Sequence, residues 1–248
     1  MTYYPKARFV KSKLNYPESD GQPMADNTLQ FEYIVRIKTN LEILYREEEV
    51  FVAGDLFWYP VEGKPRVVVA PDVMVAFDRP KGYRGSYKQW EEEDKAPDVV
   101  FEVLSQSNTT VEMIRKMRFY ERHGVKEFII IDPYQCELVA YVRQEDTLEE
   151  VEMGSDSWKS QVLNITIEGA EESVNFYFPD GHPFHTPEEW NELFRKEKEE
   201  KKEALQREEQ ALQREKTAIE QAEQERLEKE AALQELERLK AELAKLKQ

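Results

Sequence analysis

Hydrophobic positions first recur at helical spacing just after Asp26 and Asn27, which follow a turn-rich stretch at 15–25. Asp and Asn are favoured helix N-caps because their side chains accept a hydrogen bond from a free main-chain N–H of the first turn. The apolar positions behind them are Leu29, Ile34, Ile37, Leu41 and Leu44. This spacing predicts a long amphipathic helix with one apolar face.

The segments that follow are rich in valine and aromatic residues, which is typical of strands. They are residues 50–59, 66–77, 98–105, 126–132 and 137–143 and, less clearly, 158–167 and 174–178. The fourth and fifth of these runs flank Pro133, and we predict that they form a hairpin.

A second helix interrupts the series of strands. Thr109 and Glu112 have the spacing of a capping box, in which each residue satisfies a free main-chain N–H of the first turn. The helix is predicted to run to His123 and to stop at Gly124, the residue type that most readily ends a helix. Helix, strands, helix and further strands in this order predict an α/β (α+β) fold.

A third helix of about sixty residues is predicted from Thr186 to the end of the chain, with Pro187 in its first turn. Apolar residues recur along it at heptad spacing: Ala204, Leu205, Ala211, Leu212, Ala218 and Ile219, then Ala232, Leu236, Leu239, Leu243 and Leu246. The two sets do not share one register, because charged residues from 225 to 229 interrupt the stripe. This predicts a stutter or a hairpin bend.

Leucines at heptad spacing need a partner, so residues 187–248 are predicted to form a coiled coil that joins two copies of the chain through its last two heptads. A single solvated helix held by many charge pairs is the alternative. Residues 1–186 would form the globular domain.

The charge of the chain argues against simple affinity for nucleic acid. The net charge is −16; residues 187–248 carry 18 acidic and 14 basic residues, or −4, which leaves −12 for residues 1–186. A domain this acidic lacks the usual footprint of an unaided nucleic-acid binder, although it can still contain a local basic channel.

Other features of the composition narrow the class of protein. A single cysteine, Cys136, excludes an intramolecular disulfide and a cysteine zinc cage. The N-terminus lacks the apolar core of a signal peptide, and the apolar runs are too short to span a bilayer. We therefore expect a cytoplasmic protein without a membrane segment.

The candidate chemistry rests on a carboxylate, Glu102, inside an otherwise apolar strand, where a charge is rarely tolerated without a partner. Lys116 lies on the following helix, and Asp72 begins another apolar run. Magnesium prefers hard oxygen ligands, which these two carboxylates and the carbonyl of Val103 would supply. A nearby lysine can orient a water or stabilise transition-state charge. The set would suit a metal-dependent phosphodiesterase.

Two strings carry a resemblance to a known family: PDVVFEVLSQSN at 97–108 and EMIRKMRFYERHGVKEFIIIDP at 112–133. They resemble the Uma2 family of endonucleases, in the form of its cyanobacterial members, within the PD-(D/E)XK nuclease superfamily. The match runs from about residue 16 to 133, and more loosely to about 189. It implies a restriction-endonuclease-like mixed sheet flanked by helices. It also implies cleavage of DNA that depends on Mg²⁺, with Mn²⁺ as a possible substitute.

Several site residues follow from this resemblance. Asp72 with the preceding Pro matches the PD element, and Glu102 matches the acidic member of (D/E)XK. Leu104 stands where the superfamily usually has its lysine, and Lys116, four residues before a Tyr, matches the helix lysine thought to replace it. The family carries another acidic residue before its first long helix, and Glu18 lies near that position. Glu32, on the helix itself, is the alternative candidate for it. The resemblance implies Asp72 and Glu102 as metal ligands and Lys116 as the catalytic cation, and the Val103 carbonyl, next to Glu102 on its strand, is the further ligand expected from the residues themselves.

Alternatives stay open at this point. Glu102 and Lys116 could be a buried ion pair in a metal-free site, and the chain could be a non-catalytic interaction module that uses the coiled coil. The site could also hydrolyse another phosphate ester, and the choice between DNA and RNA is open. The loop with Lys81, Arg84, Lys88 and Trp90 could contact nucleic acid or be a plain solvated loop.

Overall fold

The computed structural model describes residues 15–19, 21, 25–153 and 157–246, with side chains as far as residue 240. The chain divides into two compact units, Met1–Glu188 and Glu189–Gln248. In these described ranges, no helix combines the length and the apolar character needed to cross a membrane.

A six-stranded mixed sheet forms the centre of the first unit, in the order β1-β3-β5-β6-β7-β8. Its strands are β1 (Val50–Gly54), β3 (Val73–Phe77), β5 (Val99–Val103), β6 (Glu127–Asp132), β7 (Glu137–Gln144) and β8 (Thr147–Glu150). Of these neighbours, β5 and β6 are parallel and the others antiparallel. Parallel neighbours need a crossover, and α2 (Thr110–His123) supplies it. The predicted mixed sheet flanked by helices is confirmed.

Both predicted helices of the first unit have the expected caps. The Asn27 side chain accepts a hydrogen bond from the main-chain N–H of Gln30 at the start of α1 (Thr28–Leu44). At the start of α2, the Thr109 side chain accepts one from the N–H of Glu112. Gly124 ends α2 in the left-handed conformation, with φ 96°, which glycine adopts without steric cost.

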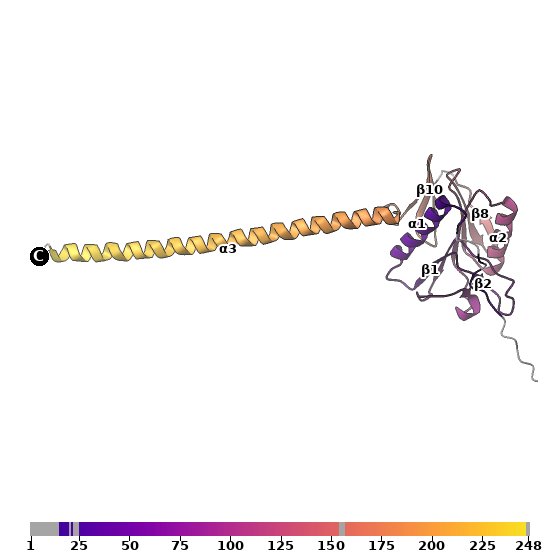
Figure 1. The fold of residues 1–248 in the computed structure, drawn as a ribbon, viewed down its shortest axis with the longest axis horizontal. Coiled ribbons are helices and arrows are strands. Elements are labelled where there is room, and N and C mark those ends of the chain that lie inside the picture. The colour runs from indigo at the N-terminus through magenta and orange to yellow at the C-terminus, as the bar shows by residue number, and fades with distance from the viewer. Residues whose placement is uncertain (1–14, 20, 22–24, 154–156, 247–248) are drawn as a thin grey trace, which may run out of the picture. The chain divides into compact units, whose positions relative to one another are not determined.

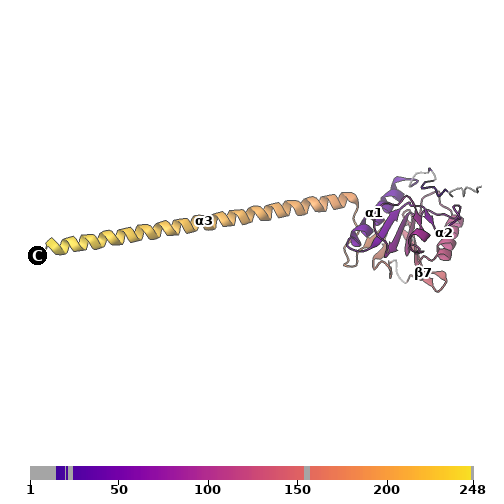
Figure 2. The same ribbon diagram turned by 90° about the horizontal axis from the view of Figure 1, so that it is seen from below.

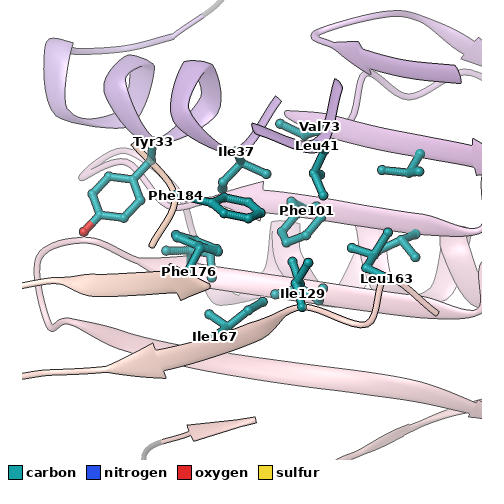
Figure 3. Close-up of a cluster of buried hydrophobic side chains, with 14 of the residues drawn as sticks. Tyr33, Ile37, Leu41, Val73, Phe101, Ile129, Leu163, Ile167, Phe176 and Phe184 are labelled. Carbon is teal, nitrogen blue, oxygen red and sulfur yellow. The ribbon is translucent and has the colours of Figure 1, made fainter. Parts of the chain in front are cut away.

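The helices lie on opposite faces of the sheet (Figure 1). Figure 3 shows the α1 face, where Ile37 and Leu41 pack on Phe101 and Ile129. A second, three-stranded sheet completes this core with Ile167 and Phe176. Its strands are β9 (Ser157–Lys159), β10 (Thr166–Gly169) and β11 (Val174–Tyr177).

The other face of the sheet packs against α2 and a short parallel pair of strands, β2 (Trp58–Tyr59) and β4 (Tyr87–Lys88). A 3-10 turn, Gln89–Glu91, follows β4. Side chains alternate between the faces of a strand. Phe101 and Val103 of β5 therefore face α1, and Glu102 between them faces α2.

Three strand predictions were too long. The run at 50–59 divides into β1 and β2, because Asp55 has a positive φ of 46° and breaks the extended chain. In the run at 66–77, β3 begins only at Val73, after Pro71. The run at 158–167 turns at Asn164, where φ is 56°. Valine-rich composition cannot reveal such breaks, which depend on the local backbone conformation.

Helix α3 (Pro187–Leu246) provides the described residues of the second unit, and Figure 2 shows it as one uninterrupted helix. The hairpin bend considered near residue 225 is therefore excluded. Leu205, Leu212 and Ile219 are all more than half exposed, and Leu236 and Leu239 are about half exposed. The coiled coil stays a prediction.

Candidate active site

The carboxylate of Glu102 is held by two side chains of α2. Lys116 Nζ donates a hydrogen bond to Glu102 Oε2 at 2.8 Å, and the Tyr120 hydroxyl donates one to Oε1. Residues four apart on a helix project from the same face, so one turn of α2 presents both donors. Glu102 is 1% exposed and Tyr120 is fully buried. Both oxygens of this buried carboxylate are therefore satisfied.

Asp72 directly precedes β3, the strand next to β5. In the antiparallel register of β3 and β5, Val73 is opposite Phe101, which brings the preceding Asp72 level with Glu102. Asp72 Oδ2 accepts a hydrogen bond of 2.7 Å from the main-chain N–H of Val103. The structure thus brings Asp72, Glu102 and Lys116 together at one end of the central strands.

Burial and like charge shape the ionisation of the two acids. Burial, together with the negative charge of Glu102, raises the pKa of Asp72 to about 8, although Lys116 opposes this shift. Burial also raises the pKa of Glu102, against the opposing effects of Lys116 and Tyr120. Two carboxyl groups in one buried region resist ionising together. Without a metal, Asp72 is therefore mostly protonated at neutral pH.

Lys116 stays positively charged in this setting. Burial alone would lower its pKa, but the charges of Glu102 and Asp72 and the hydrogen bond to Glu102 outweigh burial and raise the pKa above its ordinary value. At neutral pH its ammonium group is therefore a cation rather than a proton acceptor.

Val103 was expected to offer its carbonyl to a metal, and both its main-chain N–H and its carbonyl form hydrogen bonds. Its N–H binds Asp72, and its carbonyl accepts a hydrogen bond of 2.8 Å from Gln30 Nε2, on α1. A carbonyl oxygen has two lone pairs, so one remains for a further ligand. Gln30 is buried, and its Oε1 accepts from the N–H of Asp26, which ties the start of α1 to the end of β5.

Among the described residues, the carboxylates of the two further acidic candidates, Glu18 and Glu32, form no hydrogen bond or ion pair with Asp72, Glu102 or Lys116. The carboxylate of Glu18 sits against Gly85, where a Cβ would come within 2.1 Å of it. Glu32 is exposed on α1, the helix that covers the other face of the sheet.

Leu104, at the position where the resemblance led us to expect a lysine, has surroundings that suit an apolar side chain. It lines an apolar cavity of about 290 Å³ between α2 and the sheet, together with Met113, Met117 and Ile130. A lysine there would place its stem in apolar surroundings. Lys116 supplies the cation from α2 instead.

The basic and aromatic loop before β5 is neutralised within the protein. Arg84 pairs with Glu92 at 2.5 Å and lies over the ring of Phe51 at 4.0 Å. Lys88 pairs with Glu91. The Lys81 ammonium donates to main-chain carbonyls at the end of α1, and Trp90 packs on Tyr16. These cations are committed to internal contacts, which favours the reading of the loop as structural.

Three residues near the site had no assigned role in the sequence reasoning. Tyr120 served only as a marker of the motif, although its spacing from Lys116 placed it on the same helix face. Gln30 gave no local signal, because its contact with Val103 spans 73 residues. Asp55, at the end of β1, adds negative charge that raises the pKa of Asp72. Like Glu102, it is a carboxylate inside a run predicted as a strand, so the same signal in the sequence could have marked it.

Comparison with known proteins gives one family. Residues 13–171 match the family Uma2, whose description reads "Putative restriction endonuclease". The chain is also similar to a solved structure, described as a putative nuclease belonging to DUF820 from Anabaena variabilis ATCC 29413. The two are 13% identical with a TM-score of 0.43, over 58% of this chain and 77% of the other. No curated protein matches the chain.

Proposed function

This chain belongs to the Uma2 family, and we propose that it is a metal-dependent endonuclease that hydrolyses phosphodiester bonds of DNA. Membership of a family described as restriction endonucleases supports nuclease activity in general. The observation that carries the finer proposal is the contact of Lys116 Nζ with Glu102 Oε2 at 2.8 Å, beside Asp72, which directly precedes the next strand.

The donor set fits Mg²⁺ or Mn²⁺. Asp72 and Glu102 supply carboxylate oxygens, and the Val103 carbonyl has a second lone pair, which together are the hard ligands that these ions prefer. In the described part of the chain, no three His, Cys, Asp or Glu side chains form a metal cage, so water and substrate would complete the shell. The raised pKa of Asp72 means that its carboxyl holds a proton at neutral pH without metal, and a divalent cation would displace that proton and favour the carboxylate.

Each protein group has a role in this proposal. A bound metal would polarise the scissile phosphate and make its bound water more acidic. The Lys116 ammonium would stabilise negative charge that develops on the phosphate. The Tyr120 hydroxyl holds Glu102 in place, and the N–H of Val103 orients Asp72.

The test is cleavage of linear duplex DNA by the full chain with Mg²⁺ or Mn²⁺, compared with single strands and RNA. We expect Lys116→Ala to abolish cleavage and to leave metal affinity largely intact. Lys126→Ala is the matched control, because Lys126 also pairs with a buried carboxylate, Asp98, at 2.7 Å, outside the site. Wild-type rates in Lys116→Ala, or equal losses in both variants, would refute the assignment.

We propose in addition that α3 joins two copies of the chain. Support comes from the exposure of Leu205, Leu212 and Ile219 at heptad spacing, since apolar surface of this kind is normally covered. Two joined copies would bring two sites to the two strands of a duplex. If the full chain forms a dimer and neither binds metal nor cleaves, the non-catalytic interaction module is the better description.

A further inference from the structure

Helix α2 presents a row of arginines on the face that points away from the sheet. Arg115, Arg118 and Arg122 are all exposed, and their spacing of three and four residues places them on one side of the helix. Lys116 and Tyr120, which hold Glu102, lie on the buried side of the same helix. The row therefore belongs to the element that supplies the candidate catalytic cation.

These arginines differ from the cations of the loop before β5. Arg79, Arg84 and Lys88 pair with carboxylates that follow them in the chain. Within the described residues, no ion pair or hydrogen bond engages the guanidinium groups of Arg115, Arg118 or Arg122. Among the described residues, Lys64, Arg66 and Lys159 are also exposed cations without an ion pair, but the row gathers three guanidinium groups on one helix face.

We propose that the arginine row of α2 is a contact surface for the phosphate backbone of a nucleic-acid duplex. The inference rests on the proposed function in taking DNA as the polyanion. At 1.5 Å per residue, the row is about 10 Å long. Phosphates of one strand are spaced about 3.4 Å along the duplex axis, so the row matches about three of them. Guanidinium groups suit this role, because their planar fork binds phosphate oxygens in pairs.

Backbone contacts of this kind leave a quantitative mark on binding. Each neutralised phosphate contributes about 0.9 to the slope of log affinity against log salt, so three arginines contribute about 2.7. Between 50 and 200 mM salt, that share alone weakens binding about 40-fold. The contribution carries no sequence preference, because phosphates are the same at every base pair.

The experiment measures binding of the full chain to a fluorescent duplex in EDTA, so that cleavage does not interfere, across a series of KCl concentrations. The test variant carries Arg115→Gln, Arg118→Gln and Arg122→Gln. Gln keeps the helix propensity close to that of Arg. The control carries Lys38→Gln, Arg46→Gln and Lys159→Gln, which removes the same charge from the side of the sheet that α1 and β9 cover.

We expect the test variant to lose about 2.7 from the salt slope and the control to keep the wild-type slope. With Mg²⁺, the test variant should show a raised KM with kcat largely unchanged. Equal slopes in the two variants, or an unchanged slope in the test variant, would overturn the proposal. Arginine-dependent binding of poly-glutamate as tight as that of the duplex would also overturn it, in favour of an acidic protein partner. Arginine-dependent DNA binding without any cleavage by the wild type would instead refute the proposed function alone.

Discussion

Replacement of Tyr120 by Phe removes one hydroxyl and leaves the ring in place. The ring stacks on Trp58 at 6.2 Å and contacts Phe128 at 5.0 Å between centroids, and these contacts do not involve the hydroxyl. What is lost is a hydrogen bond to Glu102, which is 1% exposed. A hydrogen bond to a charged group contributes about 1.5–3 kcal/mol, so we expect Tyr120→Phe to lower the free energy of unfolding by that amount.

Tyr87→Phe is the matched control. Tyr87 is also fully buried on the α2 face of the sheet, but its hydroxyl donates to the neutral main-chain carbonyl of Lys95 at 2.9 Å. A neutral bond contributes about 0.5–1.5 kcal/mol, so this variant should lose less stability than Tyr120→Phe. The difference between the two variants isolates the effect of the charge on Glu102.

The assay is urea unfolding of the full chain, followed by tryptophan fluorescence at one protein concentration. Far-ultraviolet dichroism is unsuitable, because α3, with 60 residues, would dominate the signal. Cleavage by Tyr120→Phe should fall about 10–100-fold, as expected when a residue that orients a metal ligand is removed. If Tyr120→Phe costs no more stability than Tyr87→Phe, Glu102 is not a charged acceptor and the reasoning fails.

Three further predictions concern pH, a buried carboxylate and self-association. Because folding raises the pKa of Asp72 to about 8, the folded state binds more protons than the unfolded state between about pH 4 and 8, and stability falls as pH rises through this window. In EDTA, Asp72→Asn should therefore have a higher melting temperature than the wild type at pH 9 and a similar one at pH 4. Added Mg²⁺ should raise the melting temperature of the wild type alone. A difference in melting temperature between the two proteins that does not change with pH would contradict this. Glu127 is fully buried and accepts hydrogen bonds from the Ser160 hydroxyl and from two main-chain N–H groups. Glu127→Ala leaves these three donors unpaired, so it should lower the free energy of unfolding in urea by more than about 3 kcal/mol. Cleavage per folded molecule should be unchanged. A cost below about 1 kcal/mol would show that water replaces these bonds. Leu236→Glu with Leu239→Glu should halve the mass measured by light scattering if α3 forms a dimer, and an unchanged mass would locate the interface elsewhere.

Local sequence signals predicted the helices of this protein well. Asn27, Thr109 and Gly124 act in the structure as the caps that their residue types indicate, because a cap depends only on neighbouring main-chain groups. The limits of the strands were predicted less well. Asp55 and Asn164 adopt positive φ angles inside valine-rich or aliphatic runs, and Asp and Asn enter that region more readily than most residue types, a local signal that the composition of the runs obscured.

The candidate site, too, was predicted in part from the sequence and decided in part by tertiary packing. Glu102 was conspicuous in the sequence, because a charge inside an apolar strand requires a partner, and the resemblance to Uma2 indicated Asp72 and Lys116. Helical periodicity could place Lys116 and Tyr120 on one face, but only the packing of α2 on the sheet decided that this face meets Glu102.

The sequence by itself determined which residues carry charge, where the helices start and stop, and that one strand contains a carboxylate in need of a partner. The tertiary structure alone decided which partner each charge finds. It committed the cations near Glu92 to internal ion pairs, joined Gln30 to Val103 across the chain and left the arginines of α2 exposed. Contacts between distant segments depend on how the sheet pairs and which face each helix covers, and neither is encoded in a local pattern.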